Sequence, residues 1–322
     1  MFHPDGKHVL GGYDDGIRQW QFADGEVIGM QMGMELMSIS GSMDHKWVVC
    51  GTNGAGASVW DREMREKAIN VEDENIVDGV DVSPDSTRFA TGNRDGEASI
   101  WSIPSGERLV GPLKHDAGVR GIRFSPNGEH IATASNGKRI RIFDSRNGDE
   151  LITIAGIVTP RLAATTPIAW SRDGRQIFAT SEDVKIKAFD ASTGTQLAES
   201  QILHDGGDDV PSIALAANGK FVATIADHSI VFLDTSTLSR IDPVIEDGER
   251  IRSIAISPDS RYVATGRFDG KIAIRDLGKI LPELYGPVNV SICAFLCSIS
   301  HVDNICRYLL AKKNKFNKMS SH

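Results

Sequence analysis

A pattern of three apolar runs and two turns recurs along this chain of 322 residues. Its clearest copies are 80–102 (VDVSPDSTRFATGNRDGEASIWS), 122–144 (IRFSPNGEHIATASNGKRIRIFD) and 254–276 (IAISPDSRYVATGRFDGKIAIRD). Weaker copies are found at 2–20, 39–61, 168–190 and 213–234. One such unit is too small to bury its apolar residues alone. The copies must therefore pack against one another in a repeat architecture.

The spacing of the copies indicates which repeat architecture this is. An anchor residue stands at or beside the end of each copy: Trp20, Trp60, Trp101, Phe143, Phe189, Leu233 and Arg275. The first and last anchors are six intervals apart, so the period averages roughly 42 residues, which is typical of four-stranded propeller blades and longer than helical repeats. Alternating Ile, Val, Phe and Thr between Pro-Asp, Asn-Gly and Asp-Gly turns predicts short strands. We therefore expect an all-β fold, a seven-bladed β-propeller of four-stranded antiparallel blades.

Taken together, the seven copies resemble the WD40 family over residues 2–277. The family's Trp-Asp dipeptide is present at Trp60-Asp61, and Phe143-Asp144 is a softened form of it. The resemblance implies four strands in each blade, A to D, with A innermost. In the third blade these strands are expected at 80–83, 88–92, 98–102 and 107–110.

The resemblance also implies a buried polar network in each blade. In the family it links a loop His, a strand-B Ser or Thr, a turn Asp and the strand-C Trp. No copy in this chain has all four residues. The third keeps Thr91, Asp95 and Trp101, and the fourth keeps His115 and Thr133. A partly satisfied network stabilises less than a complete one, so modest rigidity is expected. The anchors from Trp20 to Leu233 are predicted to be structural and not catalytic.

The first copy has no strand A in front of Phe2, which leaves a sheet edge to be covered. After a candidate strand D near 281–285, the segment 288–298 alternates apolar residues as a strand A does. We expect 288–298 to pair with 8–12 and to complete blade 1. The alternative is that the chain is a fragment of a longer product. The predicted domains are a single propeller over 1–300 and a short basic tail over 301–322, disordered or a short helix.

Composition argues against several classes of function. The net charge of −8 and the pI near 5.6 argue against nucleic-acid binding, which needs a basic surface. The longest apolar run, 287–300, is too short to span a bilayer, and no signal peptide is visible at Met1. Of four cysteines only Cys50 lies within the repeats, so no disulfide framework is predicted. A cytoplasmic location is expected, with the nucleus as the alternative.

The full sequence contains none of the HExxH, GxSxG or P-loop motifs. Cys293, Cys297, His301 and Cys306 are residue types that bind zinc, but their spacing matches no usual structural zinc site. We therefore expect no enzyme, no cofactor and no metal. Two alternatives stay open. One is a metal-dependent module that uses this cluster, and the other is a repeat array that served as the sensor of a larger multidomain protein.

The loops from strand D to the next strand A and the B–C turns should emerge together, on what we call the top rim. The A–B and C–D turns form the opposite, bottom rim. The top-rim loops are rich in acids: Glu72, Asp73, Glu74, Asp116, Asp205, Asp208, Asp209, Glu246, Asp247 and Glu249. The bases near them are Lys114, Arg161 and Arg250. Such an imbalance favours a basic partner, because the field of the acids steers its approach.

Large side chains at the B–C turns are candidate anchors for a partner, because Tyr and Arg are frequent at interface hot spots. They are Tyr13, Arg94, Arg139 and Phe268. The predicted protein-binding residues are these four together with Glu72, Asp73, Glu74, Asp208 and Asp209. We expect a non-enzymatic scaffold, monomeric within a complex. Its expected partner is a protein or peptide, basic in character, and neither nucleic acid nor membrane.

Overall fold

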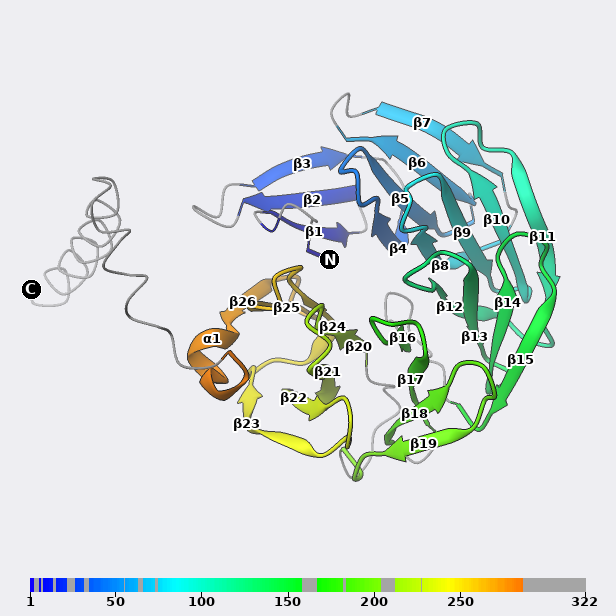
Figure 1. Ribbon diagram of the computed structural model, residues 1–322. Coiled ribbons are helices and arrows are strands. Elements are labelled where there is room, and N and C mark those ends of the chain that lie inside the picture. The colour runs from blue at the N-terminus through cyan, green and yellow to red at the C-terminus, as the bar shows by residue number, and fades with distance from the viewer. Residues whose placement is uncertain are drawn as a thin grey trace, which may run out of the picture. The chain divides into compact units, whose positions relative to one another are not determined.

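The computed structural model of the protein describes residues 1–2, 6, 8–13, 16–21, 27–31, 35–54, 56–62, 66–72, 75–157, 167–181, 184–203, 212–226 and 228–285. The chain divides into two compact units, Met1–Ile280 and Leu281–His322. The first unit is built almost entirely from β-strands, as the repeats predict (Figure 1). In the second unit the described residues are 281–285.

The described strands form seven antiparallel sheets, numbered here in chain order. Sheet 1 contains β1 (His8–Tyr13), β2 (Gly16–Gln21) and β3 (Val27–Gln31). Sheet 2 contains β4 (Leu36–Gly41), β5 (Trp47–Thr52), β6 (Ala57–Asp61) and β7 (Glu66–Val71). Sheet 3 contains β8 (Val77–Val82), β9 (Arg88–Asn93), β10 (Glu97–Ser102) and β11 (Arg108–Lys114). Sheet 4 contains β12 (Val119–Phe124), β13 (His130–Ser135), β14 (Arg139–Asp144) and β15 (Glu150–Ala155).

Sheet 5 contains β16 (Ile168–Trp170), β17 (Gln176–Thr180), β18 (Ile186–Asp190) and β19 (Gln196–Glu199). Sheet 6 contains β20 (Ile213–Leu215), β21 (Phe221–Ala226), β22 (Ser229–Asp234) and β23 (Arg240–Glu246). Sheet 7 contains β24 (Ile251–Ile256), β25 (Tyr262–Arg267) and β26 (Ile272–Asp276). The register of the anchors shows that sheet 1 holds strands B, C and D of its repeat, and sheet 7 holds strands A, B and C.

Each sheet is a meander in which strands consecutive in the chain pair with each other, because short turns join them. The A strands of neighbouring sheets contact one another along the series β4, β8, β12, β16, β20 and β24. The sheets are therefore arranged around a common centre (Figure 1). This arrangement confirms an all-β propeller of four-stranded antiparallel blades.

The core lies between neighbouring sheets. All six residues of β5 and of β21 are buried, because a B strand is covered on both faces. The close approach of sheets also requires small residues. A Cβ at Gly51 would lie 2.3 Å from the Val77 carbonyl oxygen, and a Cβ at Gly92 would lie 2.5 Å from Val119 Cγ1. Glycine at these two positions therefore allows neighbouring sheets to pack.

The inner edge of sheet 1 is partly occupied by the first residues of the chain. Leu10 N donates to Met1 O at 2.8 Å, Met1 N donates to Leu10 O at 2.6 Å, and Phe2 forms a β-bridge with Val9. The expected closing strand, 288–298, lies outside the described residues and stays a prediction. Such a strand would have to displace Met1 from Leu10 or pair with β1 beyond it.

Side chains of the first and last sheets meet directly. Phe2 and Val9 form one apolar cluster with Ala264 of β25, and Ile272 and Ile274 of β26 pack against that cluster. Contact between sheets 1 and 7 therefore exists within the first unit, through apolar packing. It does not depend on the closing strand that the sequence predicts.

The strand D expected near 281–285 is wrong. After the short helix α1 (Leu277–Ile280), Pro282–Leu284 forms a 3₁₀ turn, in which Leu284 N donates to Leu281 O at 3.1 Å. Pro282 explains the difference: it has no N–H to give to a ladder, and its fixed φ suits the first turn of a helix.

Candidate functional site

The anchor residues form a framework within the sheets, and sheet 3 keeps the Trp–Thr bond of the network that the resemblance implies, while Asp95 is exposed in its turn. Trp101 Nε1 of β10 donates to Thr91 Oγ1 of β9 at 2.9 Å. In sheet 2, Cys50 stands where sheet 3 has Thr91, and Trp60 Nε1 donates instead to Ser58 Oγ at 2.9 Å. The acceptor changes, but the indole N–H is bonded in both sheets. The other predicted anchors are the half-buried Trp20 and the buried Phe143, Phe189 and Leu233.

Sheet 4 satisfies the same position with a loop histidine. His115 Nε2 is 2.8 Å from Thr133 Oγ1, and the His115 ring meets the Phe143 ring edge-on with centroids 5.7 Å apart. Burial, together with the nearby Arg141 guanidinium, lowers the pKa of His115. The neutral imidazole is thus favoured in the folded protein.

Sheet 7 has Arg275 at the anchor position, and the buried carboxylate of Asp247 compensates it. Asp247 Oδ2 accepts from Thr265 Oγ1 at 2.9 Å and from Arg267 Nε at 3.1 Å. Its Oδ1 accepts from Arg267 Nη2 at 2.7 Å and also from Arg275 Nη2. The side chain of Asp247 has no exposed surface. The prediction that Asp247 adds to the acidic field of the top rim is therefore wrong, because two guanidinium groups and a hydroxyl surround its carboxylate.

A signal in the sequence could have identified Asp247 as a framework residue. His115 stands 18 residues before Thr133, and Asp247 stands 18 residues before Thr265. The shared spacing places both loop side chains against the strand-B threonine of their own sheet. Asp247 is therefore the counterpart of the loop His, with a carboxylate in place of the neutral imidazole.

Arg94, a predicted anchor for a partner, belongs to a second buried carboxylate cluster. Arg94 Nε donates to Asp78 Oδ2 at 2.8 Å, and Arg94 Nη2 donates to Asp78 Oδ1 at 3.2 Å. Arg120 of β12 also donates to Asp78 Oδ2, so this carboxylate joins sheet 3 to sheet 4. Hydrogen bonding to Asp78 raises the pKa of Arg94. The Arg94 guanidinium is engaged within the protein, which limits what it offers to a partner.

Arg139, also predicted as an anchor, forms an ion pair on the top rim. Arg139 Nη1 donates to Asp116 Oδ2 at 2.9 Å, and Arg141 Nη2 is 3.8 Å from Asp116 Oδ1. Two guanidinium groups thus compensate one of the ten acids counted on this rim. The acidic field of the top rim is accordingly weaker at Asp116 than the sequence predicts.

Phe268 is the predicted binding residue whose ring the structure places in solvent. Phe268 is 46% exposed and lies in the B–C turn after β25. The Arg250 and Arg252 guanidinium carbons are 4.9 and 5.9 Å from its ring centroid. Phe268 N donates to Arg250 O at 3.1 Å, which fixes the turn beneath the ring. Sheet 7 therefore presents an aromatic side chain flanked by two cations.

The remaining predicted binding residues are only partly described. Glu72 is exposed after β7. Tyr13 ends β1, and its side chain lies outside what the structure describes. Asp73, Glu74, Asp208 and Asp209 also lie outside the described residues. Their role on the top rim stays a prediction.

On the bottom rim the A–B turns share one geometry. After β8, Ser83 Oγ donates to Asp85 Oδ1 at 2.6 Å and accepts from Arg88 N at 3.0 Å. The same Ser-to-acceptor bond recurs in four further turns, as Ser42–Asp44, Ser125–Asn127, Ser171–Asp173 and Ser257–Asp259. The Ser-x-Asp/Asn pattern thus bonds its own backbone and holds each turn in one shape.

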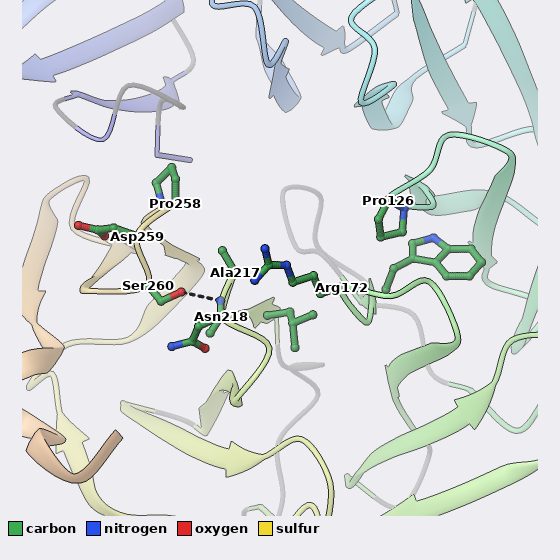
Figure 2. Close-up of a pocket in the computed structure, with 10 residues that line it drawn as sticks. Pro126, Arg172, Ala217, Asn218, Pro258, Asp259 and Ser260 are labelled. Atoms are coloured by element: carbon green, nitrogen blue, oxygen red, sulfur yellow. Dashed lines mark hydrogen bonds between the residues drawn. The ribbon is translucent and has the colours of Figure 1, made fainter. Parts of the chain in front are cut away.

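A cavity of about 540 Å³ opens among the A–B turns of sheets 4 to 7 (Figure 2). Its lining includes the apolar residues Pro126, Trp170, Leu215 and Pro258 and the charged residues Arg172 and Asp259. None of the predicted binding residues lines this cavity. Its walls come from four sheets, and the sequence alone does not show that these turns meet.

The described residues contain no group of three or more His, Cys, Asp or Glu side chains that could hold a metal ion. Cys293, Cys297, His301 and Cys306 lie outside the described residues. Cys50 is a free, buried thiol whose pKa is raised by burial. In the same described part of the chain, no helix is long and apolar enough to cross a membrane.

Sequence comparison gives the same family as the repeats do. The WD40 family (WD domain, G-beta repeat) matches residues 69–102, 108–144 and 244–276. Eukaryotic translation initiation factor 3 subunit I of Aspergillus terreus is 26% identical over 197 residues, which are 58% of this chain and 58% of that protein. Serine-threonine kinase receptor-associated protein of Gallus gallus is 24% identical over 194 residues, 60% of this chain and 53% of that protein. The chain thus spans little more than half the length of these relatives.

Solved structures have the same fold at lower sequence identity. The β-propeller domain of Cps50 (Swd1) from Myceliophteria thermophila is 18% identical, with a TM-score of 0.71 over 86% of this chain and 95% of that chain. Hydrazine synthase from Kuenenia stuttgartiensis is 14% identical, with a TM-score of 0.72 over 85% of this chain and 94% of that chain. At such identities the likeness concerns the fold alone. The findings together show WD40 repeats at three places along a β-propeller fold.

Proposed function

We propose that this chain is a non-enzymatic scaffold that binds a protein or peptide partner on its top rim. The observation that carries this proposal is Phe268, an aromatic residue 46% exposed in a B–C turn with Arg250 and Arg252 against its ring. Cation–π contacts limit the motion of the ring, so less entropy is lost when a partner covers it. Aromatic and Arg side chains are also enriched at the centres of interfaces.

The relatives support the scaffold part of the proposal. One is named as a subunit of a translation initiation factor, and the other as a receptor-associated protein. Both names describe proteins that assemble with other proteins, and we extend that behaviour to this chain. The match to WD40 repeats also supports the non-enzymatic interpretation of the sequence.

The proposed partner has two kinds of surface. It is basic where it meets the predicted acidic residues Glu72, Asp73, Glu74, Asp208 and Asp209, and apolar where it covers Phe268. Asp116 and Asp247 contribute little to the attraction, because arginines of the chain already compensate them. Raising the salt concentration should therefore slow association, while loss of the Phe268 ring should speed dissociation.

Affinity capture from native lysate tests the top rim. Phe268→Ala should lose partners that the natural chain retains, by roughly thirtyfold or more if Phe268 is a hot spot. Leu197→Ala is the matched control, because Leu197 is 51% exposed on the outer strand β19, away from the B–C turns. Equal capture by the natural chain and both variants would contradict the assignment of the rim.

We also propose that the ring has seven blades, with sheets 1 and 7 as neighbours and 288–298 as the missing strand A. Apolar packing between Val9 and Ala264 supports the placement of these two sheets next to each other. Deleting 287–300 should lower the melting temperature, because β1 would lose a partner along its inner edge. An unchanged melting temperature would show that 288–298 does not belong to the blade.

The alternative of a metal-dependent module requires a stoichiometric zinc ion. Zinc analysis of the purified chain tests this alternative.

A further inference from the structure

Three of the six described A–B turns on the bottom rim have proline as their second residue, and the turn after β16 is one of the three that do not. The second residues of the six described turns are Met43, Pro84, Pro126, Arg172, Ala217 and Pro258. Arg172 is the charged residue of this set. Proline at this place pre-sets the backbone of a turn, so a repeat that replaces it gives up a local stabilisation. A departure of this kind is expected where a side chain has a function.

Successive A–B turns pack against one another, which fixes the backbone and Cβ of Arg172. A Cβ at Gly174 would lie 3.6 Å from Pro126 Cδ, and a Cβ at Gly219 would lie 3.9 Å from Arg172 Cβ. Asn218 N donates to Ser260 Oγ at 2.9 Å, which ties the next two turns together. The turns around Arg172 are therefore held in place before any ligand arrives.

The guanidinium of Arg172 extends into the cavity on this rim (Figure 2). It makes no ion pair or hydrogen bond with any residue that the structure describes. The acid in the lining does not compensate it: Asp259 Oδ1 accepts from Ser257 Oγ at 2.5 Å and from Arg261 N at 3.0 Å, both in its own turn. The cavity thus combines a cation that lacks a counter-ion among the described residues with apolar walls from Pro126 and Trp170.

We propose that this cavity binds the carboxylate side chain of an acidic peptide segment from a partner protein, with Arg172 as its ion-pair partner. The planar guanidinium can bond both oxygens of a carboxylate. The apolar residues beside the acid would pack on Pro126, Trp170, Leu215 and Pro258. A nucleic-acid ligand is disfavoured, because one cation in a chain of net charge −8 gives little phosphate neutralisation. This second binding face does not depend on the top-rim proposal.

The test uses the full chain and three pools of capped nonapeptides. The pools carry Glu, Gln or phosphoserine at the central position and random neutral residues elsewhere, and retention on the immobilised chain is measured by mass spectrometry. The Glu pool should be retained in preference to the Gln pool. Arg172→Ala and Arg172→Pro should each lower its retention about tenfold or more, as expected for lost charged hydrogen bonds.

Two variants keep the result interpretable. Arg175→Ala removes an exposed arginine of the same turn that does not line the cavity, so it should bind the Glu pool as the natural chain does. Arg172→Pro restores the residue found in three other turns, and the Arg172 backbone N–H has no hydrogen bond to described residues. Its melting temperature should not fall below that of the natural chain. Equal retention of the Glu and Gln pools, full binding by Arg172→Pro, or retention of the phosphoserine pool alone would each overturn the proposal.

Discussion

Sheets 3 and 7 satisfy the equivalent anchor position with different residue types, one neutral and one charged. Both have a threonine on strand B, Thr91 and Thr265, facing the anchor of strand C. In sheet 3 the anchor is Trp101, a neutral donor that needs one acceptor. In sheet 7 the anchor is Arg275, a cation, and the loop residue Asp247 supplies the charge that it needs.

The comparison shows that the repeat specifies a complementary set and not fixed residues. Sheet 4 supports this, because the loop position that holds Asp247 in sheet 7 holds His115 there, against an apolar anchor. In sheet 3 an indole N–H bonds to a hydroxyl, in sheet 4 an imidazole does so, and in sheet 7 a carboxylate bonds to guanidinium groups. Each pairing satisfies the hydrogen-bonding atoms at this position. They differ in what happens when one member is removed, because an unpaired buried charge costs more than an unpaired neutral group.

The largest difference should appear on removing the carboxylate of sheet 7. Asp247→Ala leaves the Arg267 and Arg275 guanidinium groups mostly buried without a counter-charge. We expect a loss of about 3–5 kcal/mol in the free energy of unfolding, measured by urea denaturation. Glu249→Ala, two residues away at an exposed position, is the control and should change stability by less than about 0.5 kcal/mol. Similar losses in both variants would mean that Asp247 is not paired as described.

Removing the cation should cost less than removing the acid. Arg275→Ala leaves Asp247 bonded to Arg267 and Thr265, so we expect a loss of about 2 kcal/mol. In the double variant Asp247→Ala/Arg275→Ala, the total loss should be smaller than the sum of the single losses by at least about 1 kcal/mol. Strict additivity in the same denaturation series would show that the two side chains do not interact.

The shared threonine gives the next test. Thr91→Val leaves the Trp101 indole N–H without its acceptor, which should cost about 1 kcal/mol because the indole is only half-buried. Thr265→Val should cost less than Thr91→Val, since Asp247 keeps two guanidinium partners. Paired unfolding curves of the two variants measure this order. A reversed order would mean that the hydroxyl of sheet 7 is the more important of the two.

The sequence predicts the strands well, and the errors have physical causes. Strand D of the third repeat was expected at 107–110, but β11 runs over Arg108–Lys114. Two bulges in its pairing with β10 place extra residues on β11, and an apolar run does not reveal bulges. The strand expected near 281–285 fails at Pro282, whose ring favours the 3₁₀ turn.

The binding residues were harder to predict, because exposure depends on pairs that the sequence does not place together. Arg94 and Arg139 are predicted anchors for a partner, but each already has a carboxylate partner within the protein, in Asp78 and Asp116. Phe268 was predicted from the turn pattern and is exposed. Arg172 was visible in the sequence as a break in the Ser-Pro turn pattern, yet its cavity depends on four sheets and appears only in the fold.

The smallest expected effect is the pH response of the loop position. Burial lowers the pKa of His115 below its ordinary value of 6.5, so between these two values the unfolded chain binds more protons than the folded chain. Stability should therefore rise with pH through this window and fall as the pH drops below about 6.5. His115→Gln keeps a hydrogen-bonding side chain but cannot titrate, so its stability curve from pH 5 to 7 should be flatter than that of the natural chain. Parallel curves for the natural chain and His115→Gln would contradict a neutral, half-buried imidazole at Thr133.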